Sequence, residues 1–367
     1  MGERPIRTTE LRGLRLSRGY TQEALAARVG VSRQAYAAIE SGNARPSVDV
    51  ALRIAQAVDA SVEALFSTRH PNDAITVPFV GALPPSAPFP VRLAEVGGRL
   101  LAYPTRGGSL GVANADGTAE PTGDGRVRVS LFRDRPPSPD LVVAGCDPAF
   151  AFVAEALRRQ RGIEVLWVQV GSRAALQMLA RGEAHVGGVH LRDTETGIYN
   201  RPWVERLIPW PCSLVRFATW EESLLLAEGN PLGVAGLADV ARPGTRFVNR
   251  EEGSGSRALV DRSLSELGLP AEVLDGYLTT HAAGHLEVAA AIASGAADAG
   301  VGIRAAGTLY GLHAVTLAEE PYDLVIPGPL LDLPAVQCLT DVLRSSGLRD
   351  QVSALGGYDT SAMGTPT

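Results

Sequence analysis

One turn of the sequence, residues 249–257, has the composition of an anion-binding turn. It lies between a short apolar segment, residues 245–248, and a segment of helical pattern, residues 258–267. Glycines let backbone N–H groups approach a ligand, serine hydroxyls add neutral donors, and a helix start adds partial positive charge. Arginine adds a fork of N–H donors. The turn predicts half of a site for a small anion, formed by Ser254, Gly255, Ser256 and Arg257.

A second group of polar residues lies where the strands of a predicted parallel sheet end. Apolar strand patterns at residues 141–144, 165–170 and 184–189 alternate with helical patterns at 149–160 and 172–180. This alternation predicts a βαβαβ unit, in which ligands bind beyond the carboxyl ends of the strands. The other half of the site is expected to comprise Cys146, Asp147, Ser172 and His190.

Several charged candidates also have a structural interpretation. A carboxylate repels an anion, so Asp147 is expected to cap the helix that begins near residue 149. His190 is either a hydrogen-bond donor to the ligand or a core histidine with its bonds satisfied. Asp298 is included in the site as a residue that braces Arg257 or a hinge. The glutamates at 251–252 are expected at the solvated surface; if they point inward, a cationic or zwitterionic ligand is favoured instead.

Three other chemistries fit parts of the sequence less well. Residues 253–258, with Asp275 further on, match the dinucleotide-binding fingerprint, but their glycines come several residues after the strand. His281 and His285 have the spacing of zinc ligands without the glutamate of a zinc protease. Residues 107–111 match the nucleophile-elbow pattern without the required strand and helix. Anion binding is therefore preferred, with no metal and no catalytic residues expected.

Charge is distributed unevenly along the chain. Residues 1–70 contain ten arginines and seven acidic residues, whereas the remainder contains 24 arginines and 33 acidic residues. The N-terminal part suits a polyanionic partner, and the rest does not. Helical patterns predict a five-helix bundle there, at residues 8–18, 21–29, 33–40, 47–58 and 62–66.

Five short motifs of this bundle resemble the Cro/repressor-like (Xre) helix-turn-helix regulators. They are Thr21-Gln22, Leu25-Ala26, Val29-Gly30-Val31-Ser32, Ile39-Glu40-Ser41-Gly42 and Arg45-Pro46. The resemblance implies a second helix of the pair in the major groove of an operator. The expected DNA-binding residues are Gln22, Ser32, Arg33, Gln34, Ala38, Ser41 and Asn43. Arg33 is the main candidate for a guanine contact, and the alternative is a helical protein-interaction bundle.

Residues 71–139 have a different composition. Prolines interrupt the first part, and strand patterns at 91–103 and 127–132 flank glycine-rich turns. We therefore expect a Pro-rich linker followed by a small β-rich connector.

The C-terminal part resembles the type 2 periplasmic-binding-protein-like domain of cytoplasmic regulators and of molybdenum-cofactor proteins. Five stretches carry this resemblance, at residues 144–149, 189–200, 249–257, 288–300 and 319–324. It implies two α/β lobes that bind a ligand between them, with molybdate or tungstate as the usual ligand of the group. Cys146 departs from this expectation, since serine is the simpler oxyanion donor.

Together these patterns predict a multidomain fold. An all-α helix-turn-helix bundle spans residues 1–70, the connector spans 71–139 and a two-lobed α/β substrate-binding domain spans 140–360. Lobe one covers about 140–218 and 322–360, and lobe two covers about 219–321.

The expected function is that of a one-component transcription regulator, which is not an enzyme. It is expected to act as a homodimer, because one such bundle contacts one half-site. No apolar run is long enough to span a membrane and the start has no apolar signal region, so a cytoplasmic location is expected. The expected partners are double-stranded operator DNA and a small ligand. The alternatives are a molybdenum-cofactor-related binding protein or enzyme, and a regulator that senses another small metabolite.

Overall fold

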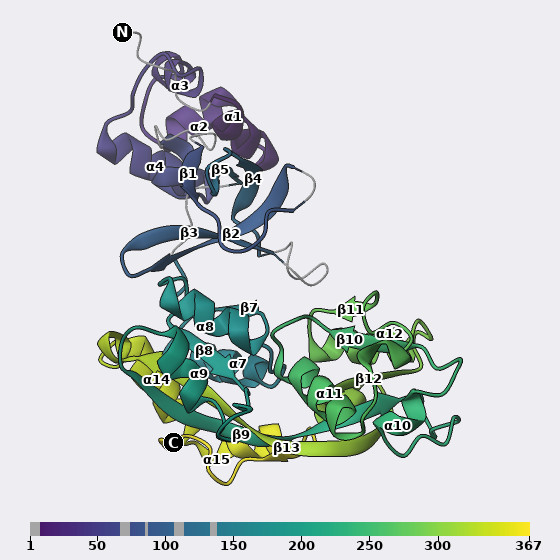
Figure 1. The fold of residues 1–367 in the computed structure, drawn as a ribbon. Coiled ribbons are helices and arrows are strands. Elements are labelled where there is room, and N and C mark those ends of the chain that lie inside the picture. The colour runs from purple at the N-terminus through teal and green to yellow at the C-terminus, as the bar shows by residue number, and fades with distance from the viewer. Residues whose placement is uncertain (1–7, 67–73, 85–86, 106–113, 133–137) are drawn as a thin grey trace. The chain divides into compact units, whose positions relative to one another are not determined.

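The computed structural model describes residues 8–66, 74–84, 87–105, 114–132 and 138–367 (Figure 1). The chain divides into two compact units. One comprises residues 1–75 with 130–135, and the other comprises residues 76–129 with 136–367. The elbow-like pattern at 107–111 lies outside the described residues. No helix in the described parts combines the length and the apolar character needed to cross a membrane.

The first unit is a bundle of short helices. They are α1 (Thr8–Ser17), α2 (Gln22–Arg28), α3 (Arg33–Glu40), α4 (Val48–Val58) and α5 (Val62–Phe66). Thr21 and Ser32 cap α2 and α3, because each side-chain oxygen accepts the N–H three residues on. Gly30 follows α2 in the left-handed region, with φ of 72°, where glycine carries no steric penalty. The chain can therefore turn directly from α2 into α3.

A buried polar network connects the first three helices. Glu40 of α3 accepts hydrogen bonds from Arg15 at 2.7 Å, from Gln22 at 2.5 Å and from the Tyr36 hydroxyl at 3.2 Å. Burial acts to raise the pKa of Glu40, but the bonds from Arg15 and Gln22 outweigh it and lower that pKa. Charge-assisted bonds as well as apolar packing therefore orient α3 within the bundle.

The second unit begins with a five-stranded sheet in the order β1-β5-β4-β2-β3. Its strands are β1 (Ile75–Pro78), β2 (Phe89–Val96), β3 (Arg99–Pro104), β4 (Gly117–Pro121) and β5 (Arg126–Leu131). This sheet confirms the predicted β-rich connector, which we call the β module. Ala94, Val96, Leu101 and Tyr103 of its β2–β3 hairpin share an apolar core with the domain that follows.

That domain is built on a nine-stranded sheet in the order β11-β10-β12-β9-β13-β8-β6-β7, with β14 paired to β9. The strands are β6 (Leu141–Gly145), β7 (Val165–Gln169), β8 (Val186–Val189), β9 (Cys212–Leu226), β10 (Phe247–Arg250), β11 (His281–Ala282), β12 (Ala299–Ile303), β13 (His313–Pro327) and β14 (Tyr358–Asp359). The helices are α7 (Phe150–Arg161), α8 (Ser172–Ala180), α9 (Arg201–Leu207), α10 (Leu237–Val240), α11 (Gly255–Glu266), α12 (His285–Ala293), α13 (Arg304–Leu309), α14 (Pro334–Leu343) and α15 (Ser346–Ser353).

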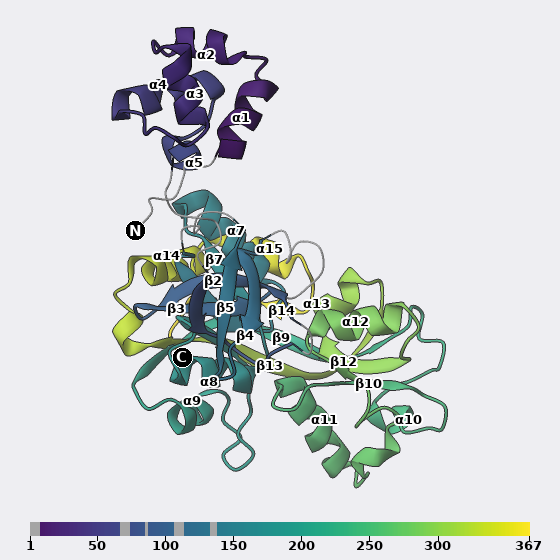
Figure 2. The same ribbon diagram turned by 90° about the horizontal axis from the view of Figure 1, so that it is seen from above.

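Two long antiparallel strands, β9 and β13, run through both lobes of this domain (Figures 1 and 2). Lobe one contains the parallel strands β6, β7 and β8, and lobe two contains the parallel pair β10 and β12. The predicted two-lobed α/β fold is therefore confirmed. The crossing strands are 15 residues each, longer than the patterns at 213–219 and 322–326 predicted. Their continuation into lobe two is less regular in sequence, because half-buried and charged residues interrupt the apolar run.

Candidate functional site

The α3 helix presents two polar side chains to solvent in its first turn. Arg33 and Gln34 are exposed, and Ala38 is half-buried about one turn further on. Ser41 and Asn43 are exposed just after the helix, and the Asn43 amide donates to the Ser41 hydroxyl at 3.0 Å. The structure therefore places Arg33 and Gln34 at the start of α3 and Ser41 and Asn43 just beyond its end.

Two further residues of the predicted DNA surface have partners inside the bundle. The Gln22 amide donates to Glu40, and the Ser32 hydroxyl accepts the N–H of Ala35 at 3.1 Å. An amide has a second N–H and an accepting hydroxyl still has its proton, so both side chains retain a donor suited to a phosphate.

A buried polar cluster lies where the two lobes meet the crossing strands, and His190 is at its centre. His190 follows β8 and is fully buried. Its Nδ1 lies 3.0 Å from Glu320 Oε2 and 3.6 Å from Glu222 Oε1, and its Nε2 lies 3.7 Å from Cys146 Sγ. Burial acts to lower the pKa of His190, but its bonds to Cys146 and Glu320 raise it to about 10. His190 is therefore a buried cation between two carboxyl groups.

The crossing strands supply acidic and aromatic members of this cluster. Trp220 and Glu222 are two residues apart in β9, as are Glu320 and Tyr322 in β13, so each pair shares one face of the sheet. Trp220 lies opposite Glu320 in the strand register. The Trp220 ring centroid lies 4.7 Å from that of His190 and 4.5 Å from that of Tyr322. The long strands thus place four side chains around one histidine.

Lobe one contributes two further residues, Ser172 at the start of α8 and Asp147 in the loop after β6. The Ser172 hydroxyl accepts the backbone N–H of His190 at 3.1 Å. Asp147 Oδ1 accepts the N–H of Ala149 at 2.9 Å and also the hydroxyl of Tyr358 at 2.6 Å. Ala149 is itself the N-cap of α7 and no side chain caps this helix, so the expectation that Asp147 caps it is wrong. Complete burial raises the pKa of Asp147 to about 7.

Lobe two contributes Arg250, which ends β10 and is 1% exposed. Its guanidinium donates to Glu251 at 2.8 and 2.9 Å, and its Nη1 lies 3.2 Å from Nδ1 of His285. Burial lowers the pKa of His285 well below its usual value, so this ring is neutral. Glu251 is paired with Arg250, which corrects the expectation that it is only a solvated surface residue.

The serines of residues 249–257, which we call the glycine-serine turn, have separate roles. Ser254 caps α11 by accepting the N–H of Arg257 at 3.2 Å. Ser256 donates its hydroxyl to Glu222 Oε1 at 3.0 Å and is fully buried. Ser256 therefore belongs to the cluster around His190, whereas the oxygen of Ser254 stabilises the helix start.

The glycines of this turn allow close contact between the lobes. A Cβ on Gly255 would lie 2.3 Å from the carbonyl oxygen of His190, so no larger residue fits there. The carbonyl of Gly253 accepts the N–H of Arg173 at 3.3 Å. Backbone from lobe two therefore lies directly against lobe one.

Two residues predicted in the site lie outside the cluster. The Arg257 guanidinium carbon lies 3.9 Å from the ring centroid of Tyr277, and its Nε pairs with Asp261 at 3.3 Å. Asp298 accepts from Arg246 at 2.7 and 3.0 Å, so the expectation that it braces Arg257 is wrong. Asp298 precedes β12 and lies at the opposite end of that strand from the site.

Sequence patterns did not place five of the buried residues in the site, namely Trp220, Glu222, Arg250, His285 and Glu320. All are at most 2% exposed. For Glu222, Arg250, His285 and Glu320 the available signal was a charged or imidazole side chain within or beside an apolar strand or helix, since such groups are rarely buried without partners.

Metal binding would require bonds in this cluster to break. Ligand atoms of Cys146, His190 and His285 lie within 4.8 Å of one another, as do those of His190, Glu222 and Glu320. However, both ring nitrogens of His190 already have partners, and Nδ1 of His285 accepts the N–H of Ile303 at 3.3 Å. The arrangement suits hydrogen bonding to a ligand better than metal coordination.

A helical bundle with an exposed polar helix start, joined to two α/β lobes around a polar cluster, defines a helix-turn-helix protein with a ligand-binding domain. The chain belongs to the family described as the PBP superfamily domain, which matches residues 154–344. A helix-turn-helix family matches residues 11–65.

Two Bacillus subtilis proteins are similar to separate parts of the chain. YvgK is 31% identical over 229 residues, which cover 62% of this chain and 73% of YvgK. The HTH-type transcriptional regulator YgzD is 41% identical over 63 residues, which cover 17% of this chain and 96% of YgzD.

Two solved structures are similar to part of this chain. One is a phosphate ABC transporter substrate-binding protein from Clostridium perfringens with bound phosphate, which is 16% identical with a TM-score of 0.46 and covers 59% of this chain and 98% of its own. The other is the tungstate ABC transporter from Geobacter sulfurreducens, which is 15% identical with a TM-score of 0.45 and covers 58% of this chain and 97% of its own.

Proposed function

We propose that this protein is a ligand-responsive, non-enzymatic transcription regulator that acts in the cytoplasm. The observation that carries the proposal is the presence of two sites in one chain. One is the exposed first turn of α3 with Arg33 and Gln34, and the other is the buried polar cluster between the lobes. The bundle contacts one half-site of double-stranded DNA, so the active form is a homodimer.

The proposed ligand is a small oxyanion, and molybdate and tungstate are the first candidates. Arg250 supplies positive charge inside the cluster, and Ser256 lies at the start of α11, where helix N–H groups favour an anion. The three carboxyl groups of Asp147, Glu222 and Glu320 favour a second candidate, a metabolite that itself carries donors, such as a zwitterion.

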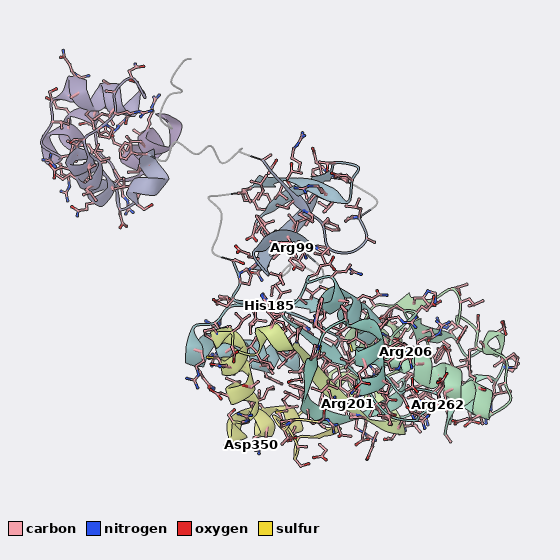
Figure 3. The ribbon with its side chains drawn as sticks, turned by 60° about the vertical axis from the view of Figure 1, so that its left-hand side comes forward. Arg99, His185, Arg201, Arg206, Arg262 and Asp350 are labelled. Carbon is pink, nitrogen blue, oxygen red and sulfur yellow. The ribbon has the colours of Figure 1, made fainter. Side chains whose placement is uncertain are left out.

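The α8 helix offers a route from the ligand cluster to the β module. Its N-terminal residue Ser172 bonds His190 in the cluster. At its other end, Arg99 of the β2–β3 hairpin donates to the carbonyls of Arg181 and Gly182 at 2.7 and 2.9 Å (Figure 3). Tyr103 donates to the carbonyl of Glu183 at 2.8 Å. A ligand that moves α8 therefore also moves the sheet whose first strand follows the bundle in the chain.

Ligand-dependent operator binding tests the proposed function. The full chain should bind DNA from its own upstream region with strong salt dependence, and one oxyanion should both raise its melting temperature and change its DNA affinity. Coupling of about 1–3 kcal/mol would change that affinity about 5- to 150-fold. Thermal shift with molybdate, tungstate, sulfate and amino acids, followed by DNA titration, measures both effects. Turnover of a molybdenum-cofactor compound with indifference to DNA would contradict the proposal.

Removing the hydrogen bonds between the β2–β3 hairpin and the end of α8 should uncouple ligand binding from DNA binding. In the double variant Arg99→Ala with Tyr103→Phe, the ligand-induced rise in melting temperature should persist. The ligand effect on DNA affinity should fall about tenfold, because bonds of about 1–3 kcal/mol are lost at the α8 end. Arg158→Ala, which removes an exposed arginine of α7, is the control. An unchanged ligand effect on DNA affinity in the double variant would exclude α8 as the route.

A further inference from the structure

Four buried polar atoms of the cluster have no hydrogen-bond partner. They are Asp147 Oδ2, Trp220 Nε1, Glu222 Oε2 and His285 Nε2. Leaving such an atom without a partner costs about 1–3 kcal/mol, so four in one cluster indicate groups reserved for a ligand. All four side chains belong to residues that are at most 1% exposed.

The bonds around His285 determine which of its nitrogens carries hydrogen. The backbone N–H of Ile303 donates to Nδ1 at 3.3 Å, and the guanidinium of Arg250 also lies 3.2 Å from Nδ1. In the neutral ring Nδ1 is then the acceptor, and the hydrogen is on Nε2. His285 Nε2 is therefore a donor, as is the indole N–H of Trp220.

The bonds around the two carboxyl groups determine where a proton would sit on each. Both donors to Asp147, the N–H of Ala149 and the hydroxyl of Tyr358, bond to Oδ1. On Glu222 the hydroxyl of Ser256 bonds to Oε1, and His190 Nδ1 approaches the same oxygen. A proton on either carboxyl group must therefore occupy the other oxygen, which is the one without a partner.

Protonation of both groups would change the character of the cluster. With both carboxyl groups ionised, Asp147, Glu222 and Glu320 would repel an entering dianion inside a low-dielectric site. With both neutral, the four unpartnered atoms become four donors, from Asp147, Glu222, Trp220 and His285. A protonated buried carboxyl group donates a hydrogen bond without adding charge.

We propose that the site takes up an oxyanion together with protons on Asp147 and Glu222, so that ligand sensing is coupled to pH. This inference rests on the proposed function, because it concerns the anion bound in the same cluster. Burial raises the pKa of both carboxyl groups to about 7, although the charge of His190 opposes it, so a bound dianion can complete their protonation near neutral pH.

Asp147 and Glu222 are surrounded, directly or through Glu320 and Arg250, by other charged or titratable groups. They come from every element of the cluster, and are Cys146, His190, Tyr199, Arg250, Glu251, Arg262, His285, Glu320, Tyr322 and Tyr358. His190, with its pKa near 10, stays charged near neutral pH. Burial keeps His285 neutral and raises the pKa of Tyr322 and Tyr358 well above the usual value.

Calorimetric titration of the full chain with molybdate, tungstate and sulfate tests the proposal. The same titration into buffer without protein gives any proton exchange by the oxyanion itself, so the remaining uptake belongs to the protein. The heat measured in two buffers of different ionisation enthalpy gives the number of protons taken up. Affinity should fall about tenfold per pH unit above neutrality for each proton required.

Neutral replacements identify the groups that take up the protons. Glu222→Gln and Asp147→Asn should each bind the oxyanion, take up one proton fewer and show a flatter pH profile. Glu155→Gln, at a half-buried position of α7 that pairs with Arg158, should match the unmodified chain. Thermal unfolding without ligand identifies a variant that fails to fold. If one of the two neutral variants does not fold, the other is used for the measurement.

Three results would overturn the inference. Oxyanion binding without proton uptake contradicts it while leaving anion sensing intact. Unchanged proton uptake in both neutral variants assigns the protons to other groups. Binding of an amino acid or amine, with no oxyanion bound at any pH, overturns the inference and also the anionic ligand of the proposed function. In that case ligand-dependent DNA binding still stands on its own measurement.

Discussion

Replacing Arg33 with alanine is expected to abolish sequence-specific DNA binding. Arg33 is the first residue of α3 and is exposed, so its guanidinium can form a bidentate contact with guanine. Loss of such a contact costs about 1–3 kcal/mol at each half-site, and a homodimer loses it twice. Titration of operator DNA and of a scrambled sequence at several salt concentrations measures the loss of affinity and of discrimination.

The matched control for Arg33→Ala is Arg158→Ala, which removes the same charge from α7. Arg158 is exposed and pairs with Glu155 at 2.9 Å. Arg158→Ala should leave both operator affinity and ligand-induced stabilisation unchanged. Arg33→Ala should lose operator affinity and keep ligand-induced stabilisation. A uniform loss of affinity for both DNA sequences in Arg33→Ala would instead indicate a phosphate contact.

Replacing Arg250 with glutamine is expected to abolish ligand-induced stabilisation. Arg250 is the buried arginine of the cluster, and its removal leaves the carboxylate of Glu251 without its partner. Arg250 is buried whereas Glu251 is half-buried, so solvent can take over part of the lost pairing; the melting temperature without ligand should still fall. Thermal unfolding with and without ligand, each variant compared with its own unliganded state, measures both effects.

Arg257→Gln distinguishes the two arginines near the glycine-serine turn. Arg257 stacks on Tyr277 and pairs with Asp261, so its removal should leave the ligand response in place. Arg250→Lys keeps the positive charge without the planar guanidinium, so its ligand-induced rise in melting temperature should be small. If Arg257→Gln loses the response and Arg250→Gln keeps it, the anion is held by the turn as the sequence predicted.

Local patterns determined the elements of this chain. The caps at Thr21 and Ser32 and the turn at Gly30 depend on residues within a few positions of each other, and all three lie in the motifs that carry the helix-turn-helix resemblance. The alternation of strand and helix after residue 140 likewise predicted the parallel strands of lobe one. Such features are accessible from sequence because neighbours along the chain satisfy them.

Only the tertiary structure decided which polar residues meet. Glu222 and Glu320 lie about a hundred positions apart, and the register of β9 with β13 brings both to His190. Tertiary structure also decides that Arg250, and not Arg257, lies in the buried cluster. Arg250 ends a buried strand and turns into the cluster, whereas Arg257 lies in the first turn of α11 and faces Tyr277.

The sequence by itself therefore determined the two kinds of domain and the glycine-serine turn of lobe two. The tertiary structure decided that this turn packs its glycines against lobe one, and that the site is acidic as well as basic. The physical reason is that strand pairing and lobe contact, rather than spacing along the chain, set the distances between buried charges.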